Sequence, residues 1–519
     1  MLLYYAVSPV HLKNAHQLGE ILGHDQIRVL VEDHAPWFTG TSFTEWAFQV
    51  VRLSEGGDLT ELEDASVSAL ICSTLQPRKM PIRLVYKAFL ENIPVVAIEE
   101  SNQVALNSRR VNNYVLPYDL LMAASEEEKA GFESDGLSTG EIQVCGWPFY
   151  RGRGYAVTEA EKAAAREKLG CSEGLKIAAL TLTGMGEAGE CPHTREKQIR
   201  LAVDGLPDNW LLLIKPHPTE DLNKVECFLG PDDTQVRLIP GSVPVSELLD
   251  ASDILLNRGV SQVCFEALVQ KIPVLVLDTG IETPFHRGLS QVVVSEPEKL
   301  RELMQQDLDL DQYNSFLNQH CQITGATERV ASVLADKDRL KNLSHQDRLR
   351  KRLTLKLCQV WQRVDLSHET ASNVFDCEES KEARALLRLM HGNANRQDLK
   401  RLADYFNYDF YQSVVKLLWV RQLESSRQLP TAEDDEMMLN FPPRLRPVWF
   451  DEAIRGWLRL LHRKGDRSAM VELLGKLDAD SIYRYNYEEL ISKARALSAK
   501  TSWLTSLRNR VVWDKSLPV

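Results

Sequence analysis

Short, continuously apolar runs alternate with amphipathic, helix-like stretches over the first 330 residues of the chain. Such runs are typical of parallel strands buried on both faces, and the stretches between them provide the crossover helices. The expected strands cover residues 2–7, 28–31, 48–53, 67–72, 93–98, 119–123 and 141–145, then 176–182, 210–214, 236–239, 254–256 and 273–277. The pattern predicts an α/β fold with two doubly wound, Rossmann-like halves.

The segment Gly146–Gly154 interrupts this alternation with Gly, Pro and Arg, which is typical of an interdomain linker. We therefore expect an N-terminal Rossmann-like domain at 1–150 and a second one at 151–335. Strand patterns stop there, and amphipathic patterns predict a helical region at 336–519, with its acidic stretch 431–436 in a loop. Ligands of doubly wound sheets bind beyond the carboxyl ends of the strands, so we expect a cleft between the two halves.

Composition excludes several classes of protein. The formal net charge of −12 argues against nonspecific binding of nucleic acid by the whole surface. The nine cysteines are scattered without a CxxC pair, which favours a reducing cytoplasm over a disulfide framework or a zinc knuckle. No apolar run approaches the ~20 residues that a membrane-spanning helix requires.

The most informative stretch is the expected strand that ends in Lys215-Pro216-His217-Pro218. Each proline restricts the residue before it to extended backbone, so Lys215 and His217 should lie on a stiff turn at the carboxyl end of the strand. Pro218 is suited to the first turn of a helix, whose N-terminus would favour a phosphate beside His217. The alternative is an ordinary surface turn.

A second group of candidates follows the expected strand 254–256. Gly259, after Arg258, permits close approach of a ligand to the backbone. Ser261 could bind phosphate oxygens with free helix N–H groups, and Glu266 could accept hydrogen bonds from ribose hydroxyls. Taken alone, this segment favours the plainer alternative, in which Ser261 is an N-cap and Glu266 is a solvated helix residue.

Two further segments follow expected strands. Thr183 and Gly184 belong to a glycine-containing loop that could line a nucleotide site, although GxG alone is a weak signal. Glu99 and Glu100 follow the expected strand 93–98, at the rim of the expected cleft. One of them could act as general base on an acceptor hydroxyl, and alternation along extended backbone lets only one face the cleft. The alternative is a solvated strand end.

These motifs together resemble the GT-B glycosyltransferases of bacterial surface polysaccharides. The KPHP segment followed by the segment 261–276, SQVCFEALVQKIPVLV, is most similar to capsule-synthesis transferases that use CMP-activated Kdo. That family typically has SQxGFEAL before GKPV, whereas here Cys264 replaces Gly and residues 270–272 are Gln-Lys-Ile. The sialyl- and polysialyltransferases share the histidine–proline pair, a serine motif and an acidic-acidic-glycine motif, which Glu99-Glu100-Ser101 resembles with Ser in place of Gly.

The resemblance implies a role for several residues. His217 would contact the donor phosphate and help the nucleotide leave, Ser261 would bind the same phosphate, and Glu99 or Glu100 would be the base. It implies a CMP-linked sugar donor, a glycan or lipid-linked acceptor and no other cofactor. We find no DxD-like metal motif and expect a metal-independent reaction.

Three alternatives remain open. A UDP-sugar transferase or a sugar-nucleotide 2-epimerase would share the two Rossmann-like domains. CDP-glycerol glycerophosphotransferases of wall teichoic acids share the histidine–proline pattern. A catalytically inactive GT-B scaffold of a polysaccharide-synthesis complex would need none of the candidate residues.

Residues 337–363 contain nine Lys or Arg and two Asp, interleaved with leucines. A basic amphipathic helix can lie on an anionic membrane, which would suit a lipid-linked acceptor at the inner face of the cytoplasmic membrane. The alternative is a helix that packs on the Rossmann-like core with its basic face solvated.

Overall fold

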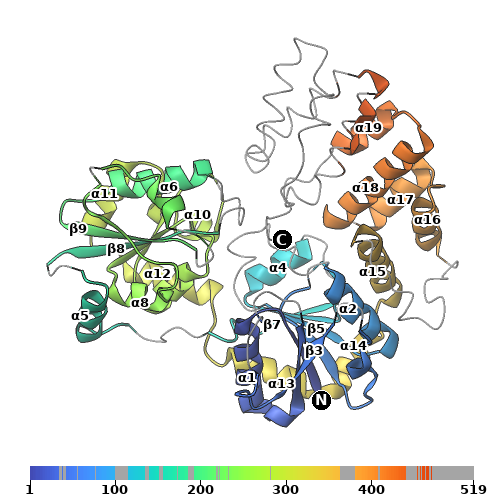
Figure 1. The fold of residues 1–519 in the computed structure, drawn as a ribbon, viewed down its shortest axis with the longest axis horizontal. Coiled ribbons are helices and arrows are strands. Elements are labelled where there is room, and N and C mark those ends of the chain that lie inside the picture. The colour runs from blue at the N-terminus through green and yellow to red at the C-terminus, as the bar shows by residue number, and fades with distance from the viewer. Residues whose placement is uncertain are drawn as a thin grey trace. The chain divides into compact units, whose positions relative to one another are not determined.

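A computed structural model gives the architecture of the chain (Figure 1). The residues described are 1–33, 38, 43–54, 57–75, 78–99, 115–134, 140–150, 156–171, 174–184, 192–217, 220, 222–231, 233–280, 282–362, 380–406 and 409–439, with parts of 453–469. The contacts divide the chain into two units, residues 1–377 and 378–519.

The first sheet has seven parallel strands in the order β3-β2-β1-β4-β5-β6-β7. Its strands are β1 (Leu2–Ala6), β2 (Ile27–Glu32), β3 (Gln49–Leu53), β4 (Ala69–Cys72), β5 (Val95–Ile98), β6 (Leu120–Ala123) and β7 (Glu141–Val144). The chain order reverses between β1 and β4, which makes that gap the topological switch point where ligands bind in such sheets.

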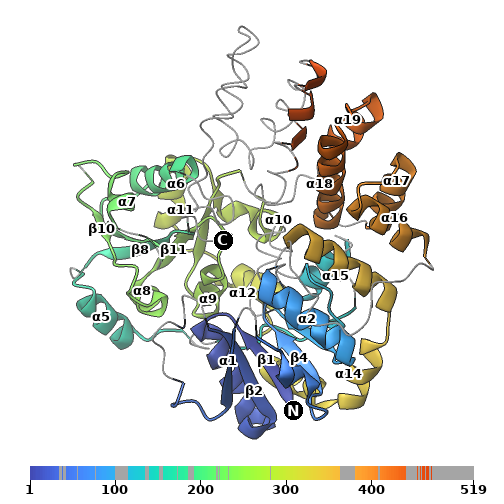
Figure 2. The same ribbon diagram turned by 45° about the vertical axis from the view of Figure 1, so that its right-hand side comes forward.

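The helices of the first domain come from both ends of the first unit. They are α1 (Pro9–Leu22), α2 (Lys79–Glu91), α4 (Glu126–Ser134), α13 (Ala326–Ala335), α14 (Lys337–Ser344) and α15 (Arg348–Gln362). Buried residues of α13 and α14, such as Val330 and Leu340, belong to the same core as β1 and α1. Figures 1 and 2 show α1 and α14 beside the first sheet. The sequence divides the chain at residues 150 and 335, whereas this packing assigns α13 and α14 to the first sheet.

The second sheet has six parallel strands in the order β10-β9-β8-β11-β12-β13. Its strands are β8 (Lys176–Thr181), β9 (Trp210–Lys215), β10 (Val236–Leu238), β11 (Ile254–Asn257), β12 (Val274–Leu277) and β13 (Val293–Val294). Its helices are α5 (Glu159–Lys168), α6 (Pro192–Asp204), α7 (Asn223–Glu226), α8 (Val245–Ala251), α9 (Val263–Val269), α10 (Pro284–Gly288), α11 (Pro297–Gln305) and α12 (Leu310–His320). The switch point lies between β8 and β11.

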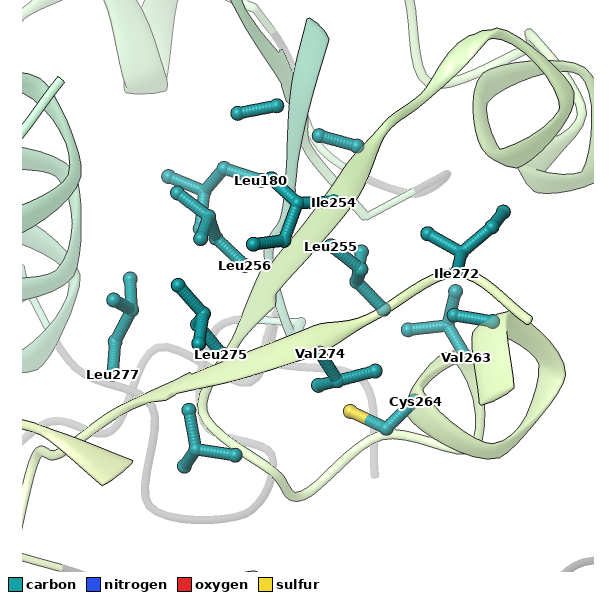
Figure 3. Close-up of a cluster of buried hydrophobic side chains, with 14 of the residues drawn as sticks. Leu180, Ile254, Leu255, Leu256, Val263, Cys264, Ile272, Val274, Leu275 and Leu277 are labelled. Carbon is teal, nitrogen blue, oxygen red and sulfur yellow. The ribbon is translucent and has the colours of Figure 1, made fainter. Parts of the chain in front are cut away.

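The core of the second domain explains why its strands read as continuous apolar runs. Every residue of β11 and β12 is buried, because helices cover both faces of a parallel sheet. Figure 3 shows Leu255 and Val274 from neighbouring strands close to Val263 and Cys264 of α9. The buried strand β11 ends at Asn257, directly before Arg258.

The segment expected as a linker packs tightly where the structure describes it. Trp147 and Phe149 are buried, and the Trp147 N–H donates to the carbonyl of Gln322 at 2.8 Å. The Phe149 N–H donates to Thr327 Oγ1 at 3.3 Å. The chain therefore passes between the two domains through two adjacent segments, around residues 146–150 and 321–327.

The second unit is helical where it is described, with α16 (Lys381–Met390), α17 (Arg396–Tyr405), α18 (Asp409–Ser426) and α19 (Ala432–Leu439). The expected fold class, two Rossmann-like α/β domains and a helical C-terminal region, is confirmed. The expectation of a loop at 431–436 is wrong, because α19 begins at Ala432.

Candidate functional site

Three of the candidate segments come together at the carboxyl edge of the second sheet. Thr183 and Gly184 follow β8, Lys215 ends β9, and Arg258 follows β11. These strands are neighbours in the order β9-β8-β11, so the segments that leave them lie side by side around the switch point. The fold therefore brings together three candidate segments that are far apart in the sequence.

Asn257, the last residue of β11, joins two of these segments. Its side-chain amide donates to the carbonyl of Thr181 at 3.0 Å and to Thr181 Oγ1 at 2.8 Å. Its Oδ1 accepts the N–H of Gly259 at 3.0 Å and lies 3.3 Å from Cys264 Sγ. The sequence analysis missed this residue, which holds the loop after β11 against the end of β8.

Arg195 of α6 joins another pair of segments. Its guanidinium donates to Glu220 Oε2 at 2.9 Å and to the carbonyl of Thr183 at 2.6 Å. Arg195 is fully buried and the Glu220 side chain is 8% exposed. The sequence analysis missed both residues, because nothing in their spacing shows that they meet.

Lys215 and His217 differ in their surroundings. The ammonium of Lys215 is buried and donates to the carbonyl of Gly241 at 2.8 Å, and burial lowers the pKa of this lysine. His217 is partly exposed. The next described helix, α7, begins only at Asn223 and has four residues. Pro218, where the sequence predicts the start of a helix beside His217, lies outside the described residues, so that helix start stays a prediction.

Arg258 and Gly259 form a close-packed turn after β11. Arg258 is 2% exposed, and its Nε donates to Thr279 Oγ1 at 3.0 Å. Gly259 has φ of +74°, and a Cβ there would lie 2.9 Å from Thr283 Oγ1. A left-handed backbone without room for a side chain explains why glycine occupies this position.

Ser261 and Glu266 lie where α9 begins. The helix starts at Val263 and its N-cap is Gln262, so the alternative of Ser261 as N-cap is wrong. Within the described part of the chain, the Ser261 hydroxyl has no hydrogen-bond partner, which leaves it available to a ligand. Burial raises the pKa of Glu266. The negative charge of Glu266 contributes to the raised pKa values of Tyr150 and Cys321. Glu266 is half-buried rather than fully solvated.

The carboxylate candidates lie in the first domain. Glu99 directly follows β5, is 2% exposed and donates its N–H to the carbonyl of Met122 at 3.0 Å. It is thus held at the carboxyl edge of the first sheet rather than solvated at a strand end. Glu100, the other candidate base, lies outside the described residues.

The switch point of the first sheet carries polar residues that the sequence analysis did not select. The N–H of Val7 donates to Nδ1 of the buried His11 at 3.0 Å. Tyr4 of β1 and Ser73, which follows β4, share a buried hydrogen bond of 2.6 Å between their hydroxyls. The histidine that follows the first apolar run by only a few residues was the available signal for this edge.

The carboxyl edges of the two sheets meet at Glu127. This residue lies in the first turn of α4, directly after β6, and its carboxylate accepts from Arg287 of α10 at 2.5 Å. The same carboxylate pairs with the buried His320 at the end of α12. Burial raises the pKa of Glu127, but hydrogen bonds from His320 and Arg287 outweigh burial and the net pKa is lowered.

The basic segment packs on the first domain over its described part, residues 337–362. Arg348 of α15 donates to Asn92 Oδ1 at 2.7 Å and stacks over the ring of Phe89 at 4.2 Å. Lys351 is buried in an ion pair with Asp119. The leucines of α14 and α15 are buried except Leu349, so this apolar face is not available to a membrane. This favours the alternative of helices packed on the Rossmann-like core.

Two kinds of feature are absent from the described residues. Among them, no three His, Cys, Asp or Glu side chains are arranged to hold a metal ion. None of the helices they form is both long and apolar enough to cross a membrane.

Proteins similar to this chain are found among solved structures, at low sequence identity. Neither a protein-family search nor a search of curated proteins gave a match. Among solved structures, the wall teichoic acid polymerase TagF is 14% identical, with a TM-score of 0.44 over 67% of this chain and 90% of its own. The S. aureus MnaA–UDP structure is 16% identical, with a TM-score of 0.43 over 65% and 97%. The UDP-GlcNAc 2-epimerase of Neisseria meningitidis bound to UDP-GlcNAc is 17% identical, with a TM-score of 0.40 over 64% and 99%.

Proposed function

We propose that this chain is a glycosyltransferase of GT-B type. It would move a sugar, Kdo or a related one, from a CMP donor onto a bacterial surface glycan or glycolipid. The observation that carries the proposal is the convergence of the segments after β8, β9 and β11 at one switch point. Doubly wound sheets bind nucleotides at this position. The proposal includes a cytoplasmic protein whose lipid-linked acceptor is met at the inner face of the membrane.

The chemistry of this edge suits a phosphate. Lys215 and Arg258 supply buried positive charge, and His217 lies two residues beyond the end of β9. The hydroxyl of Thr183 is buried without a hydrogen-bond partner in the described structure, and Ser261 offers a second uncommitted hydroxyl. Positive groups and donors arranged before the reaction stabilise the charge that develops on a leaving phosphate.

The transfer needs a base on the opposite side of the sugar. Glu99 or Glu100, from the first domain, would accept the proton of the acceptor hydroxyl. The acceptor oxygen then forms a bond to the anomeric carbon. The bond from that carbon to the phosphate oxygen breaks, and CMP leaves with the electron pair. His217 would stabilise this phosphate, and no metal ion would take part.

Calorimetry with CMP, CDP, UDP and ADP tests the donor class. We expect the wild type to bind CMP selectively, and His217→Ala to weaken CMP binding and lower turnover with CMP-Kdo by ~10²–10³. His345→Ala is the matched control, because His345 is exposed at the end of α14. Full turnover in His217→Ala would contradict the role given to His217.

The same titration separates the alternatives. Selectivity for UDP would favour a UDP-sugar transferase or a sugar-nucleotide 2-epimerase, and an epimerase would convert its substrate without an acceptor. Selectivity for CDP would favour a CDP-glycerol glycerophosphotransferase. If none of the four nucleotides binds, the inactive scaffold becomes the better proposal.

A further inference from the structure

We infer that Arg195 is a positioning residue that fixes the two phosphate-facing segments of the second domain. The inference rests on the proposed function, and it concerns a residue that would not itself touch the donor. Arg195 lies in the first turn of α6, fully buried, behind the carboxyl ends of β8 and β9. Two of its nitrogens bind different segments: Nη2 donates to the carbonyl of Thr183, and Nη1 donates to Glu220.

The first branch leads to His217. Arg195 holds the carboxylate of Glu220 at 2.9 Å, and the N–H of Glu220 donates to the carbonyl of His217, also at 2.9 Å. The backbone that carries the imidazole is therefore tied to α6 through Glu220. A displaced guanidinium would release the far end of this turn and let the ring of His217 move away from a bound phosphate.

The second branch leads to Thr183. Pairing between β8 and β9 continues as far as Leu182, whose N–H donates to the carbonyl of Lys215 at 3.0 Å. Beyond that point the Thr183 carbonyl turns to Arg195, at 2.6 Å. Thr183 is 7% exposed, and its hydroxyl has no hydrogen-bond partner in the described structure. Arg195 thus sets the backbone that carries a candidate phosphate donor.

Geometry makes arginine specific for this position. A planar guanidinium can donate along two fixed directions at once, whereas a lysine ammonium is a single point charge on a flexible chain. Arg195→Lys should therefore keep the charge beside the buried Glu220 and lose one of the two bonds. It is the conservative variant that separates positioning from charge.

The experiment compares Arg195→Lys with Arg200→Lys, a control on the same helix whose partners are Asp204 and Asp233. Affinities for CMP and for cytidine, which lacks the phosphate, are measured by calorimetry. Hydrogen exchange is followed in peptides that cover 177–184 and 211–217. Glu220→Gln is the third variant, because the described path from Arg195 to His217 passes through Glu220.

Loss of one charged hydrogen bond corresponds to a change of ~10–100-fold in an equilibrium constant. We expect Arg195→Lys to weaken CMP binding by about tenfold or more and to leave cytidine binding within about twofold. Exchange should rise in the two peptides and stay unchanged in the first domain. Glu220→Gln should reproduce the effect on CMP and on the 211–217 peptide, and Arg200→Lys should show neither.

Three results would overturn the inference. Equal losses of CMP and cytidine affinity, with faster exchange throughout the second domain, would show that Arg195 only stabilises the fold. Unchanged CMP affinity in Arg195→Lys, or wild-type behaviour of Glu220→Gln, would show that the two segments do not depend on it. A wild type that binds no nucleotide would overturn the proposed function. Exchange in the two peptides then decides alone whether Arg195 fixes these segments.

Discussion

Removing Lys351 tests how the basic segment is attached to the first domain. Lys351 of α15 and Asp119, which precedes β6, form a buried ion pair, with side chains 5% and 7% exposed. Asp119 also accepts the N–H of Val95 at 2.6 Å. Lys351→Met keeps an unbranched side chain that is one atom shorter, and it removes the charge. The carboxylate of Asp119 then stays buried with only part of its compensation.

The expected magnitude follows from that uncompensated charge. Breaking a buried pair by removing one partner costs ~3–5 kcal/mol of unfolding free energy, more than the intact pair contributes relative to apolar residues. This corresponds to ~10²–10⁴-fold in the equilibrium between folded and unfolded first domain. Asp119→Asn in the Lys351→Met background removes the second charge and keeps an acceptor for Val95. The double variant should therefore regain most of the loss.

The pH dependence of this effect has a definite sign. Burial raises the pKa of Asp119, and the attraction of Lys351 opposes that rise. A carboxyl whose folded-state pKa lies above its unfolded value costs no stability below the unfolded pKa. The cost grows as the pH rises between the two pKa values and is complete above the folded-state pKa. Lys351→Met removes the opposing charge and raises this pKa further. The variant should therefore lose stability more steeply than wild type as the pH rises toward neutrality.

Hydrogen exchange of β5 and β6 is the assay, because their amides report opening of the first domain. The single variant should exchange faster in both strands at neutral pH, and the double variant should return close to wild type. If Lys351→Met exchanges like wild type, or the double variant is less stable than the single one, the account of Lys351 as the partner of a buried charge is wrong.

Two further predictions concern the junction of the two Rossmann-like domains. Glu127→Gln should weaken the contact with Arg287 and His320, seen as a larger radius of gyration in small-angle X-ray scattering. The pKa of Glu127 is lowered, so the wild-type contact should be fully formed above the ordinary carboxyl pKa. It should be lost as the pH falls through the lowered pKa. The Glu127→Gln variant should show no such transition. Gly146→Ala should cost ~1–3 kcal/mol of stability by urea denaturation, because φ is +87° and a Cβ would overlap the carbonyl oxygen of Gln322. A Gly174→Ala control has φ of +84° without close neighbours, so equal losses in the two variants would contradict the role of that overlap.

The sequence predicts the strands well because buried parallel strands are apolar along their whole length. The expected strands 210–214 and 273–277 match β9 and β12 closely. An amphipathic helix does not reveal which surface it covers. The return of α13 and α14 to the first sheet was therefore not predictable from their pattern alone.

The start of the helix α19 is marked in the sequence by a Thr and an Asp three residues apart. Thr431 donates its N–H and its hydroxyl to the carboxylate of Asp434, three residues later. This is the pairing of a capping box at a helix N-terminus. Asp434 also binds Arg396 and is 2% exposed, so part of the acidic run is a buried structural element rather than a solvated loop.

The candidate site was predictable in its position and only partly in its members. Strand ends gave Lys215 and Arg258, because ligands bind where parallel strands stop. Asn257 and Arg195 each contact segments that follow neighbouring strands. These contacts depend on the order of the strands in the sheet, which cannot be inferred from the spacing of residues along the chain. The same limit applies to His217. Its backbone carbonyl accepts the N–H of Glu220, which is bound in turn by Arg195, a residue 25 positions earlier in the chain.

The first domain is discontinuous in the chain, and this imposes an order on its folding. Its core includes Val330 and Leu343, which a ribosome adds after the whole of the second domain. The second domain is continuous from β8 to α12 and can complete its core as soon as it emerges. We therefore expect a newly made chain to hold its first sheet with part of the core uncovered until α13 and α14 arrive. During that interval the uncovered part of the core is open to aggregation. The arrival of α13 and α14 ends that exposure.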